Sequence, residues 1–292
     1  MSAVSADAVI HRQLDENARK LGKKLSSDVL AFFGPIEYGV DDHVRDAVEA
    51  IKEKKDRLAV LLQTTGGLIE VTQRIAECLR AHYDTVYFII PNYAMSAGTV
   101  LAMSGDEIYM DYYSILGPID PQTHKPGIGF VPALGYLEQY NKLVQKSTNG
   151  TLTTAELAVL LRSFDQAELF RYGQARELSI TLLKEWLTKY KFKTWEKTET
   201  REEFVTHEMR VERAVEIAET LNDTSRWHVH GRGISMSVLR NDLKLRIEDF
   251  GKDQALRALI RGYEKLLVEY MGKVGDLCVV HTGGKYMPIL RG

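Results

Sequence analysis

The sequence has little cysteine, no long apolar run and almost no net charge. Its only two cysteines, Cys78 and Cys278, lie far apart, which is typical of free thiols in a reducing compartment. No segment approaches the roughly 20 apolar residues of a membrane span, and residues 1–30 carry charges throughout, unlike a secretory leader. We therefore expect a cytoplasmic protein with no membrane span.

The charge balance limits the class of partner. Lysine and arginine total 38, and aspartate and glutamate total 40, so the formal net charge of the 292 residues is −2. This balance argues against a nucleic-acid partner and against binding to an anionic membrane surface. With 45% hydrophobic residues, the chain can bury a full core. Its expected partners are proteins, peptides or small molecules.

Apolar runs and amphipathic stretches alternate in the first third of the chain. The patterns predict strands at 28–33, 58–62 and 86–90, and helices at 41–54, 68–82 and 97–104. This alternation requires a parallel sheet with right-handed crossovers, and hence an α/β fold. The turns after the second and third strands then lie at one edge of the sheet, where ligands bind in such folds.

Two turns at this edge carry residues suited to nucleophilic chemistry. Ser96 lies between an apolar strand and a helix of small residues, so its hydroxyl and the free N–H groups of that helix face one ligand. Gly66 and Gly67 follow the preceding strand, and glycine lets the backbone approach a substrate closely. A helix-capping serine and an ordinary tight turn would give the same patterns, so the residues alone leave these alternatives open.

The remaining segments are mostly helical. Further helices are predicted at 8–25, 156–176, 179–188, 203–221 and 253–271, and a short strand, a Gly-Gly turn and an apolar end at 276–290. The last helix carries an apolar stripe that needs a partner surface, in this chain or in another subunit: Leu256, Ile260, Tyr263, Leu267 and Tyr270. We divide the chain into an N-terminal helical arm (1–27), an α/β domain (28–250) with a helical insert at about 133–221, and a C-terminal helix and tail (251–292).

Four short motifs carry a resemblance to known proteins. They are Thr64-Thr-Gly-Gly67, Tyr93-Ala-Met-Ser-Ala-Gly98, Asp106-Glu-Ile108 and Leu116-Gly-Pro-Ile-Asp-Pro-Gln122, and the likeness resumes at His230-Gly-Arg-Gly-Ile-Ser235. As a set they resemble the ClpP/crotonase superfamily, and more narrowly its SppA branch and the nearby serine dehydrogenase proteinase family. The resemblance implies repeated β-α units around a mostly parallel sheet, with residues 28–250 as a peptidase domain. It also implies a serine endopeptidase that needs no cofactor and no metal.

The resemblance assigns roles to individual residues. Ser96 would be the nucleophile, His230 the base that takes its proton, and Asp120 the carboxylate that orients the imidazole. In ClpP the histidine precedes the aspartate, whereas here Asp120 matches the histidine position, and the segment matching the aspartate carries His228 and His230. The serine dehydrogenase proteinase family is described as having this exchanged order.

The paired glycines imply an oxyanion hole. The N–H groups of Gly67 and Ala97, in a turn that also contains Gly66, would stabilise the negative charge of the acyl-transfer intermediate. Thr65 stands where ClpP and SppA usually have proline, which alters the turn but leaves both glycine N–H groups available.

SppA offers a different base, a lysine on a helix some forty to fifty residues after the serine. Lys142 and Lys146 fall within that interval. A buried lysine can lose its proton near neutral pH because desolvation disfavours its charge. A solvated lysine on an amphipathic helix is the commoner case, and a histidine and a lysine cannot both be the primary base.

Three classes of function remain open. The first is a serine peptidase that acts on a peptide or protein through an acyl-enzyme. The second is a crotonase-type enzyme acting on a thioester, which would not need Ser96. The third is a non-catalytic oligomeric scaffold. The charged N-terminal helix, the helical insert and the apolar stripe together predict a homo-oligomer.

Overall fold

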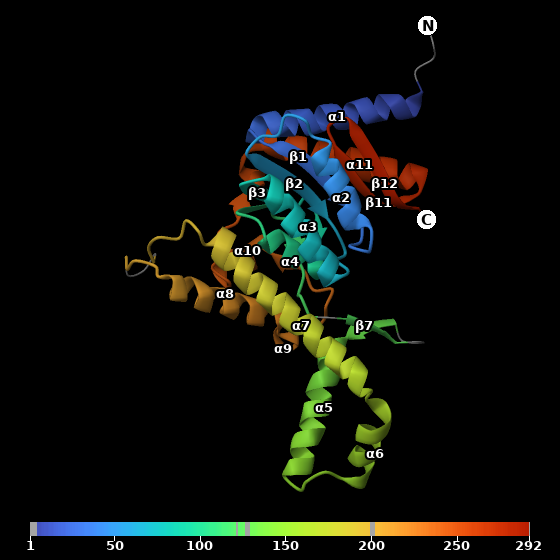
Figure 1. The fold of residues 1–292 in the computed structure, drawn as a ribbon, viewed down its shortest axis with the longest axis vertical. Helices are drawn as coiled ribbons and strands as arrows, with labels where there is room; N and C mark the ends of the chain where they lie inside the picture. The colour runs from blue at the N-terminus through green and yellow to red at the C-terminus, as the bar shows by residue number, and fades with distance from the viewer. Residues whose placement is uncertain (1–4, 121, 126–128, 199–201, 292) are drawn as a thin grey trace.

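The computed structural model describes residues 5–120, 122–125, 129–198 and 202–291. Figure 1 shows a central sheet between layers of helices, with a helical projection at one end. Within the described residues the main sheet has seven strands, which are, in spatial order, β10 (Glu248–Asp249), β5 (Glu107–Met110), β3 (Thr85–Ile89), β2 (Arg57–Gln63), β1 (Asp28–Phe33), β11 (Asp276–Thr282) and β12 (Lys285–Arg291).

Strands β10, β5, β3, β2 and β1 run parallel, and β11 and β12 extend the sheet in the antiparallel sense. The predicted α/β fold with a mostly parallel sheet is therefore confirmed. Two smaller pieces of sheet lie beside it: β4 (Tyr93–Ala94) pairs with β6 (Ile115–Leu116), which pairs with β9 (Ile234–Ser235), and β7 (Gln122–Lys125) pairs with β8 (Gly129–Pro132).

Helices cover both faces of the main sheet because its strands are apolar on both sides. Leu30 and Phe32 of β1 pack in the cluster formed with α2 (Val40–Glu49), α3 (Ile69–His82) and α4 (Ala97–Met103). Val29, Ala31 and Phe33 of the same strand point to the other face. There they pack with α1 (Ala6–Leu25) and α11 (Gln254–Val274). Near-continuous burial of this kind is typical of parallel strands.

The apolar stripe of α11 finds its partner surface within the chain. Its five residues pack with Leu14, Ala18 and Leu21 of α1 and with the second face of the sheet, and α1 lies along α11 in Figure 1. Arg261 of α11 also donates to Asp111, which is 1% exposed, at 2.6 Å. Neither the N-terminal helix nor the stripe is therefore left without a partner surface in this chain.

Four predicted helices have the wrong bounds, and the one predicted at 203–221 begins only at His207, after its cap Thr206. The helix predicted at 41–54 ends at Glu49, because residues 50–56 must connect it to β2. Within this connection the Lys55 N–H donates to Asp28 Oδ2 at 3.0 Å. The insert helices predicted at 156–176 and 179–188 are instead α6 (Thr154–Ser163) and α7 (Gln166–Trp186). The break falls at Asp165, whose side chain caps α7 by accepting from Glu168 N–H at 2.9 Å.

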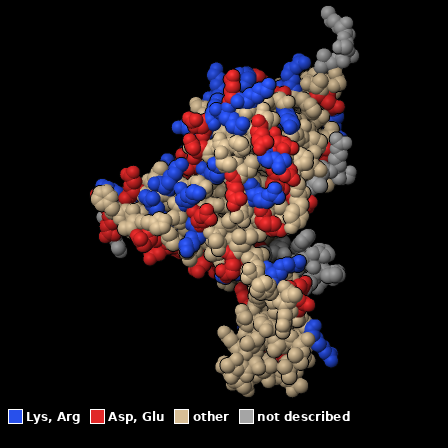
Figure 2. Space-filling model, in the orientation of Figure 1, with Lys and Arg blue, Asp and Glu red and all other residues tan. Residues whose placement is uncertain are grey.

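The helical insert forms the projection seen in Figure 1. Helices α5 (Ala133–Thr148) and α6 extend away from the sheet, whereas α7 packs against α8 (His207–Asn222) and returns toward the core. Figure 2 shows that the projection carries few charged side chains on this face of the molecule. The remaining short elements are a π-helical turn (Leu187–Lys191), α9 (Thr224–Trp227), α10 (Met236–Asn241) and a 3-10 turn (Phe250–Lys252).

Candidate active site

Ser96 lies on a strained turn between β4 and α4. Its backbone has φ 52° and ψ −121°, a conformation that residues with a side chain rarely adopt. Such strain at a strand-to-helix turn is typical of a nucleophile whose hydroxyl must be presented to substrate. The chain reaches this turn by leaving the main sheet at Pro91 and adding the two-residue strand β4, which the sequence pattern did not predict.

The Gly66-Gly67 turn is pressed against the serine turn. Gly66 has φ +92°, and a Cβ there would lie 2.5 Å from the carbonyl oxygen of Met95 and 2.8 Å from the Cβ of Ser96. Gly67 has φ +149°, and its Cβ would lie 2.0 Å from the carbonyl oxygen of Ile36. Both positions therefore require glycine, for conformation and for close approach.

The donors at this turn are not equivalent. The N–H of Gly66 donates to Thr64 Oγ1 at 3.0 Å, so it is already engaged. Among the residues that the structure describes, the N–H groups of Gly67 and Ala97 have no hydrogen-bond partner. Ala97 is the first residue of α4, and its N–H therefore lacks an intrahelical acceptor. Of the three residues predicted for an oxyanion hole, Gly67 and Ala97 are the ones with a free donor.

The small β4-β6-β9 sheet brings the predicted triad segments to one edge. Strands β4 and β6 are parallel, so Ser96 and Asp120 both follow the carboxyl ends of their strands on the same side. Strand β9 is antiparallel to β6, so His230, which precedes β9, enters from that same side. Neighbouring strands lie about 4.8 Å apart. Two segments 24 residues apart and a third 110 residues further along the chain therefore converge at a single edge.

Asp120 and His230 form a hydrogen-bonded pair at this edge. His230 Nδ1 lies 2.9 Å from Asp120 Oδ1, and the two side chains are 14% and 4% exposed. The backbone before the carboxylate is also held, since Ile119 N–H donates to the carbonyl oxygen of Leu221 at 3.0 Å. A buried carboxylate on Nδ1 fixes the tautomer in which Nε2 is free to accept a proton.

The hydroxyl of Ser96 makes no hydrogen bond to another described residue. Within the described residues, neither Ser96 Oγ nor His230 Nε2 takes part in a hydrogen bond. Catalytic hydrogen bonds are often long or misaligned without substrate and tighten on binding. His228, the other histidine of this segment, is exposed, and within the described residues it makes no hydrogen bond or ion pair with Asp120.

Both candidate lysines lie on α5, in the projecting insert. Lys142 and Lys146 are exposed, and Lys146 Nζ lies 2.5 Å from Glu156 Oε1 at the start of α6. Helix α5 packs against α6 and α7, away from α4 in Figure 1. Both lysine side chains therefore lack the burial that a lysine base requires. Within this chain the structure does not bring either lysine to Ser96.

Two threonines that sequence reasoning missed hold the site together. Thr64 Oγ1 accepts the Gly66 N–H, and the backbone of Thr64 pairs with Tyr93 and Met95 beside the serine turn. Thr99 Oγ1 is buried and lies within 2.9 Å of groups on both Ala94 and Gly117. The signal available was weak, since Thr64 opens one quoted motif and Thr99 directly follows another, but neither side chain is charged.

The motif residue Asp106 has a structural role. Its carboxylate contacts Arg80 at 2.7 Å, accepts the Val86 N–H at 2.8 Å, and pairs with Lys193. Burial alone would raise the pKa of Asp106, but Lys193, the Val86 N–H and Arg80 together hold it below the usual value. Asp106 therefore ties β3 and β5 to the helical insert and does not face Ser96.

The described part of the chain offers no obvious metal site. No group of three His, Cys, Asp or Glu side chains gathers there in a way that could hold an ion. Within the same ranges, no helix has the length and apolarity needed to cross a bilayer. Cys78 and Cys278 are free thiols.

Comparison with known proteins identifies a family and two relatives. A family model described as ClpP-like SDH-type serine proteinase matches residues 30–231. Two uncharacterized proteins of Methanocaldococcus jannaschii are each 31% identical, one over 56% of this chain and 51% of its own length, the other over 47% and 45%. The chain thus spans about half the length of these curated relatives.

Similar solved structures include two mutants of the 1510-N membrane-bound stomatin-specific protease. One is 18% identical, covers 50% of this chain and 75% of that protein, and gives a TM-score of 0.33. The other, in complex with a substrate peptide, is 13% identical, covers 89% and 85%, and gives 0.46. Because the family model matches well over half of the chain, the chain belongs to the family of ClpP-like SDH-type serine proteinases.

Proposed function

We propose that the chain hydrolyses internal peptide bonds through an acyl-enzyme on Ser96. The observation that carries this proposal is the hydrogen bond between the partly buried His230 and the buried Asp120, with Nδ1 and Oδ1 2.9 Å apart, at the edge where Ser96 lies. A serine hydroxyl needs an adjacent base to become a nucleophile, and a histidine oriented by a carboxylate is the usual one.

The proposed reaction has two halves. His230 Nε2 takes the proton of Ser96 Oγ as the oxygen attacks the scissile carbonyl, and it then gives that proton to the leaving amine. Asp120 holds the ring and stabilises the imidazolium that forms. The N–H groups of Gly67 and Ala97 face the oxygen that becomes negative, which is where preorganised donors lower the barrier most. Water repeats the attack on the acyl-enzyme with the same base.

A lysine dyad of the SppA type is the alternative within the same reaction class. It would require Lys142 or Lys146 to reach Ser96 from another subunit or after a movement of α5. The exposure of both side chains and the contact between Lys146 and Glu156 favour the histidine.

The experiment combines a covalent probe with point variants. A fluorophosphonate should label the wild type, and Ser96→Ala should abolish labelling without unfolding the chain. His230→Ala should slow labelling and peptide hydrolysis by about a thousandfold or more, while Lys142→Ala and Lys146→Ala should change them little. A dead lysine variant beside an active His230→Ala would establish the dyad. No labelling of the wild type would favour the thioester enzyme or the scaffold.

We also propose that the protein is a homo-oligomer that acts on peptide segments in the cytoplasm. With the N-terminal helix and the apolar stripe packed inside the chain, the helical insert supports the oligomer, since Leu157, Val159 and Leu161 of α6 are 43%, 48% and 74% exposed. Exposed apolar side chains gathered on one element favour a contact with another chain. Light scattering should give a mass well above 33.1 kDa, and a monomer at micromolar concentration would contradict the proposal.

The two free thiols support the proposed compartment. If the protein is cytoplasmic, fractionation of its source cells should recover it in the cytosol.

A further inference from the structure

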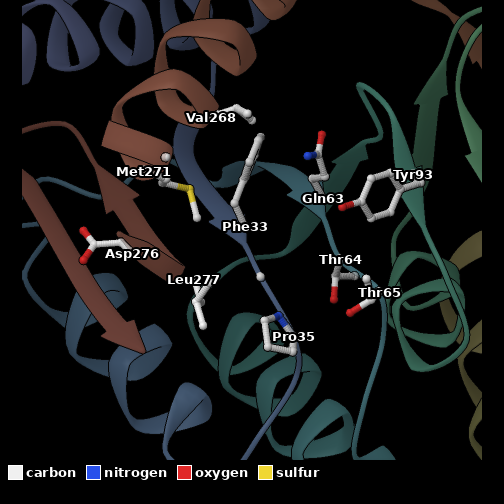
Figure 3. Close-up of a pocket in the computed structure, with 12 residues that line it drawn as sticks. Phe33, Pro35, Gln63, Thr64, Thr65, Tyr93, Val268, Met271, Asp276 and Leu277 are labelled. Carbon is white, nitrogen blue, oxygen red and sulfur yellow. The ribbon is translucent and has the colours of Figure 1, made fainter. Parts of the chain in front are cut away.

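A cavity of about 280 Å³ lies beside the candidate active site, at the carboxyl ends of β1 and β2. Figure 3 shows Met271 and Leu277 on one side of it, Thr65 and Tyr93 on the other, and Phe33 between them. Met271 and Leu277 come from α11 and β11, Thr65 directly precedes Gly66, and Tyr93 belongs to β4, which leads into the Ser96 turn. The cavity is thus shared between the C-terminal elements and the active-site turns.

The cavity is within reach of a peptide bound at Ser96. Thr65 directly precedes Gly66-Gly67, and an extended chain spans at most about 3.6 Å per residue, so the Cα atoms of Thr65 and Gly67 lie within about 7 Å. Side chains on one face of an extended peptide repeat about every 6.8 Å. A peptide whose scissile carbonyl faces the Gly67 N–H can therefore place a side chain one or two residues away into this cavity.

The lining favours an apolar side chain. Phe33, Pro35, Val268, Met271 and Leu277 supply its apolar walls. An apolar cavity of roughly 150 Å³ is enough to admit a benzene ring, so this one can hold an aromatic side chain. The thioether of Met271 would contact such a ring favourably.

The lining also disfavours a negative charge. Asp276 is the charged residue of the lining, and its Oδ2 accepts from Tyr286 O–H at 2.9 Å. Among the described residues, no lysine, arginine or histidine lines the cavity. An acidic ligand side chain would lose its hydration beside a buried carboxylate without gaining a cation.

Three of the five apolar wall residues come from outside the region that the family model matches. The family model matches residues 30–231, whereas Val268, Met271 and Leu277 belong to α11 and β11. We propose that this cavity is a side-chain subsite for the peptide substrate, which takes a large apolar residue, best an aromatic one, and rejects an acidic one. The proposal rests on the proposed peptidase function and adds a specificity that the C-terminal elements determine.

A filled cavity provides the test. Val268 is 40% exposed at the cavity, so Val268→Trp should fill it without burying new surface in the core. Val274→Trp is the matched control, because Val274 lies on the same helix, is 37% exposed and does not line the cavity. Both changes are made in Ser96→Ala protein, and binding of fluorescein-labelled peptides that differ at one position, Phe, Ala or Glu, is measured by anisotropy.

At one peptide position, Phe should bind at least about tenfold more tightly than Ala, and Glu more weakly than Ala. Val268→Trp should remove the preference for Phe over Ala, whereas Val274→Trp should keep it. A preference for Phe that survives Val268→Trp, or no position that prefers Phe, would overturn the subsite.

The binding measurement needs no turnover, so it is independent of the proposed reaction. Fluorophosphonate labelling is measured in parallel on protein that retains Ser96. If the wild type is not labelled, the proposed peptidase function is overturned, and the binding series still decides the subsite. Normal labelling with an unchanged binding profile in Val268→Trp would overturn the subsite alone.

Discussion

Thr99 Oγ1 accepts the N–H of Gly117 at 2.9 Å and lies 2.8 Å from the carbonyl oxygen of Ala94. Thr99 is three residues after Ser96, and Gly117 is three residues before Asp120. The hydroxyl can give its one proton to the carbonyl of Ala94 or to that of Gly117, but it accepts from Gly117 in either case. This buried side chain therefore fixes the spacing between the segments that carry the proposed nucleophile, Ser96, and the proposed orienting carboxylate, Asp120.

Thr99→Val should keep the shape of the side chain and leave the buried N–H of Gly117 without an acceptor. We expect the free energy of unfolding to fall by about 1–3 kcal/mol, because an unsatisfied buried donor costs its full desolvation. Hydrolysis should fall as well, since Ser96 and Asp120 lose their fixed spacing. Thr99→Ser retains the hydroxyl and should restore kcat/KM. Urea unfolding and peptide hydrolysis measure both effects, and an unchanged kcat/KM in Thr99→Val would contradict the spacing role.

Gly67→Ala should disable the oxyanion turn. A Cβ at Gly67 would lie 2.0 Å from the carbonyl oxygen of Ile36, so the turn must move and carry its N–H away from the substrate. We expect fluorophosphonate labelling to fall at least about a hundredfold. Gly262→Ala on α11 is the control, because a Cβ there meets nothing within 4 Å and alanine favours a helix. Equal labelling rates in both variants would exclude Gly67 from the oxyanion hole.

Arg261→Met should destabilise the layer formed by α1 and α11. Arg261 forms an ion pair with Asp111. The side chain of Asp111 is 1% exposed and that of Arg261 is 28% exposed. Removing one partner of a fully buried pair costs about 3–5 kcal/mol, and partial exposure of the arginine reduces the expected loss to about 2–3 kcal/mol. Arg257→Met, on the exposed side of the same helix, should change stability little. Urea unfolding measures the free energy of unfolding of both variants. Equal values in Arg261→Met and Arg257→Met would show that water solvates Asp111 as well as Arg261 does.

His281 should make the fold sensitive to mild acid. It is buried, with Nδ1 2.5 Å from the Tyr263 hydroxyl and Nε2 3.2 Å from Asp15 Oδ1. Burial lowers the pKa of His281 to about 4, and Asp15 offsets part of that shift. The unfolded chain therefore binds the proton first as pH falls, so the stability present above about pH 6.5 is progressively lost toward pH 4.

The expected loss from His281 between pH 7 and pH 4 is on the order of 3 kcal/mol. Urea unfolding at pH 7, 5.5 and 4.5 measures it. In His281→Asn the slope over this range should flatten, whereas in His207→Asn, at an exposed position, it should match the wild type. A wild-type stability that is constant from pH 7 to 4.5 would show that His281 does not carry this dependence.

The sequence predicts the parts of the fold that depend on local pattern. Continuous apolar strands and amphipathic helices between residues 28 and 104 identify the parallel sheet, and the turn chemistry places Gly67 and Ser96 at one edge of it. The resemblance to the serine dehydrogenase proteinase family adds the expectation that Asp120 and His230 act together. The structure brings these two side chains within hydrogen-bond distance.

Other parts depend on contacts that no local pattern reveals. Strands β4, β6 and β9 are two residues long, too short for any periodicity, and their pairing joins residues 93–94, 115–116 and 234–235. The role of Thr99 depends on that pairing. The stripe of α11 predicted a partner surface but could not identify α1 as the partner, because an amphipathic face specifies no particular neighbour.

The central claim is that His230, oriented by Asp120, is the base for Ser96. The most direct measurement is the rate of fluorophosphonate labelling of Ser96 in His230→Ala and in His228→Ala. His228 is the matched control because it lies two residues away, is exposed and, in the part of the chain that the structure describes, makes no hydrogen bond or ion pair with Asp120. We expect His230→Ala to be labelled about a thousandfold more slowly than the wild type and His228→Ala to be labelled at the wild-type rate. Wild-type labelling in His230→Ala would contradict the central claim.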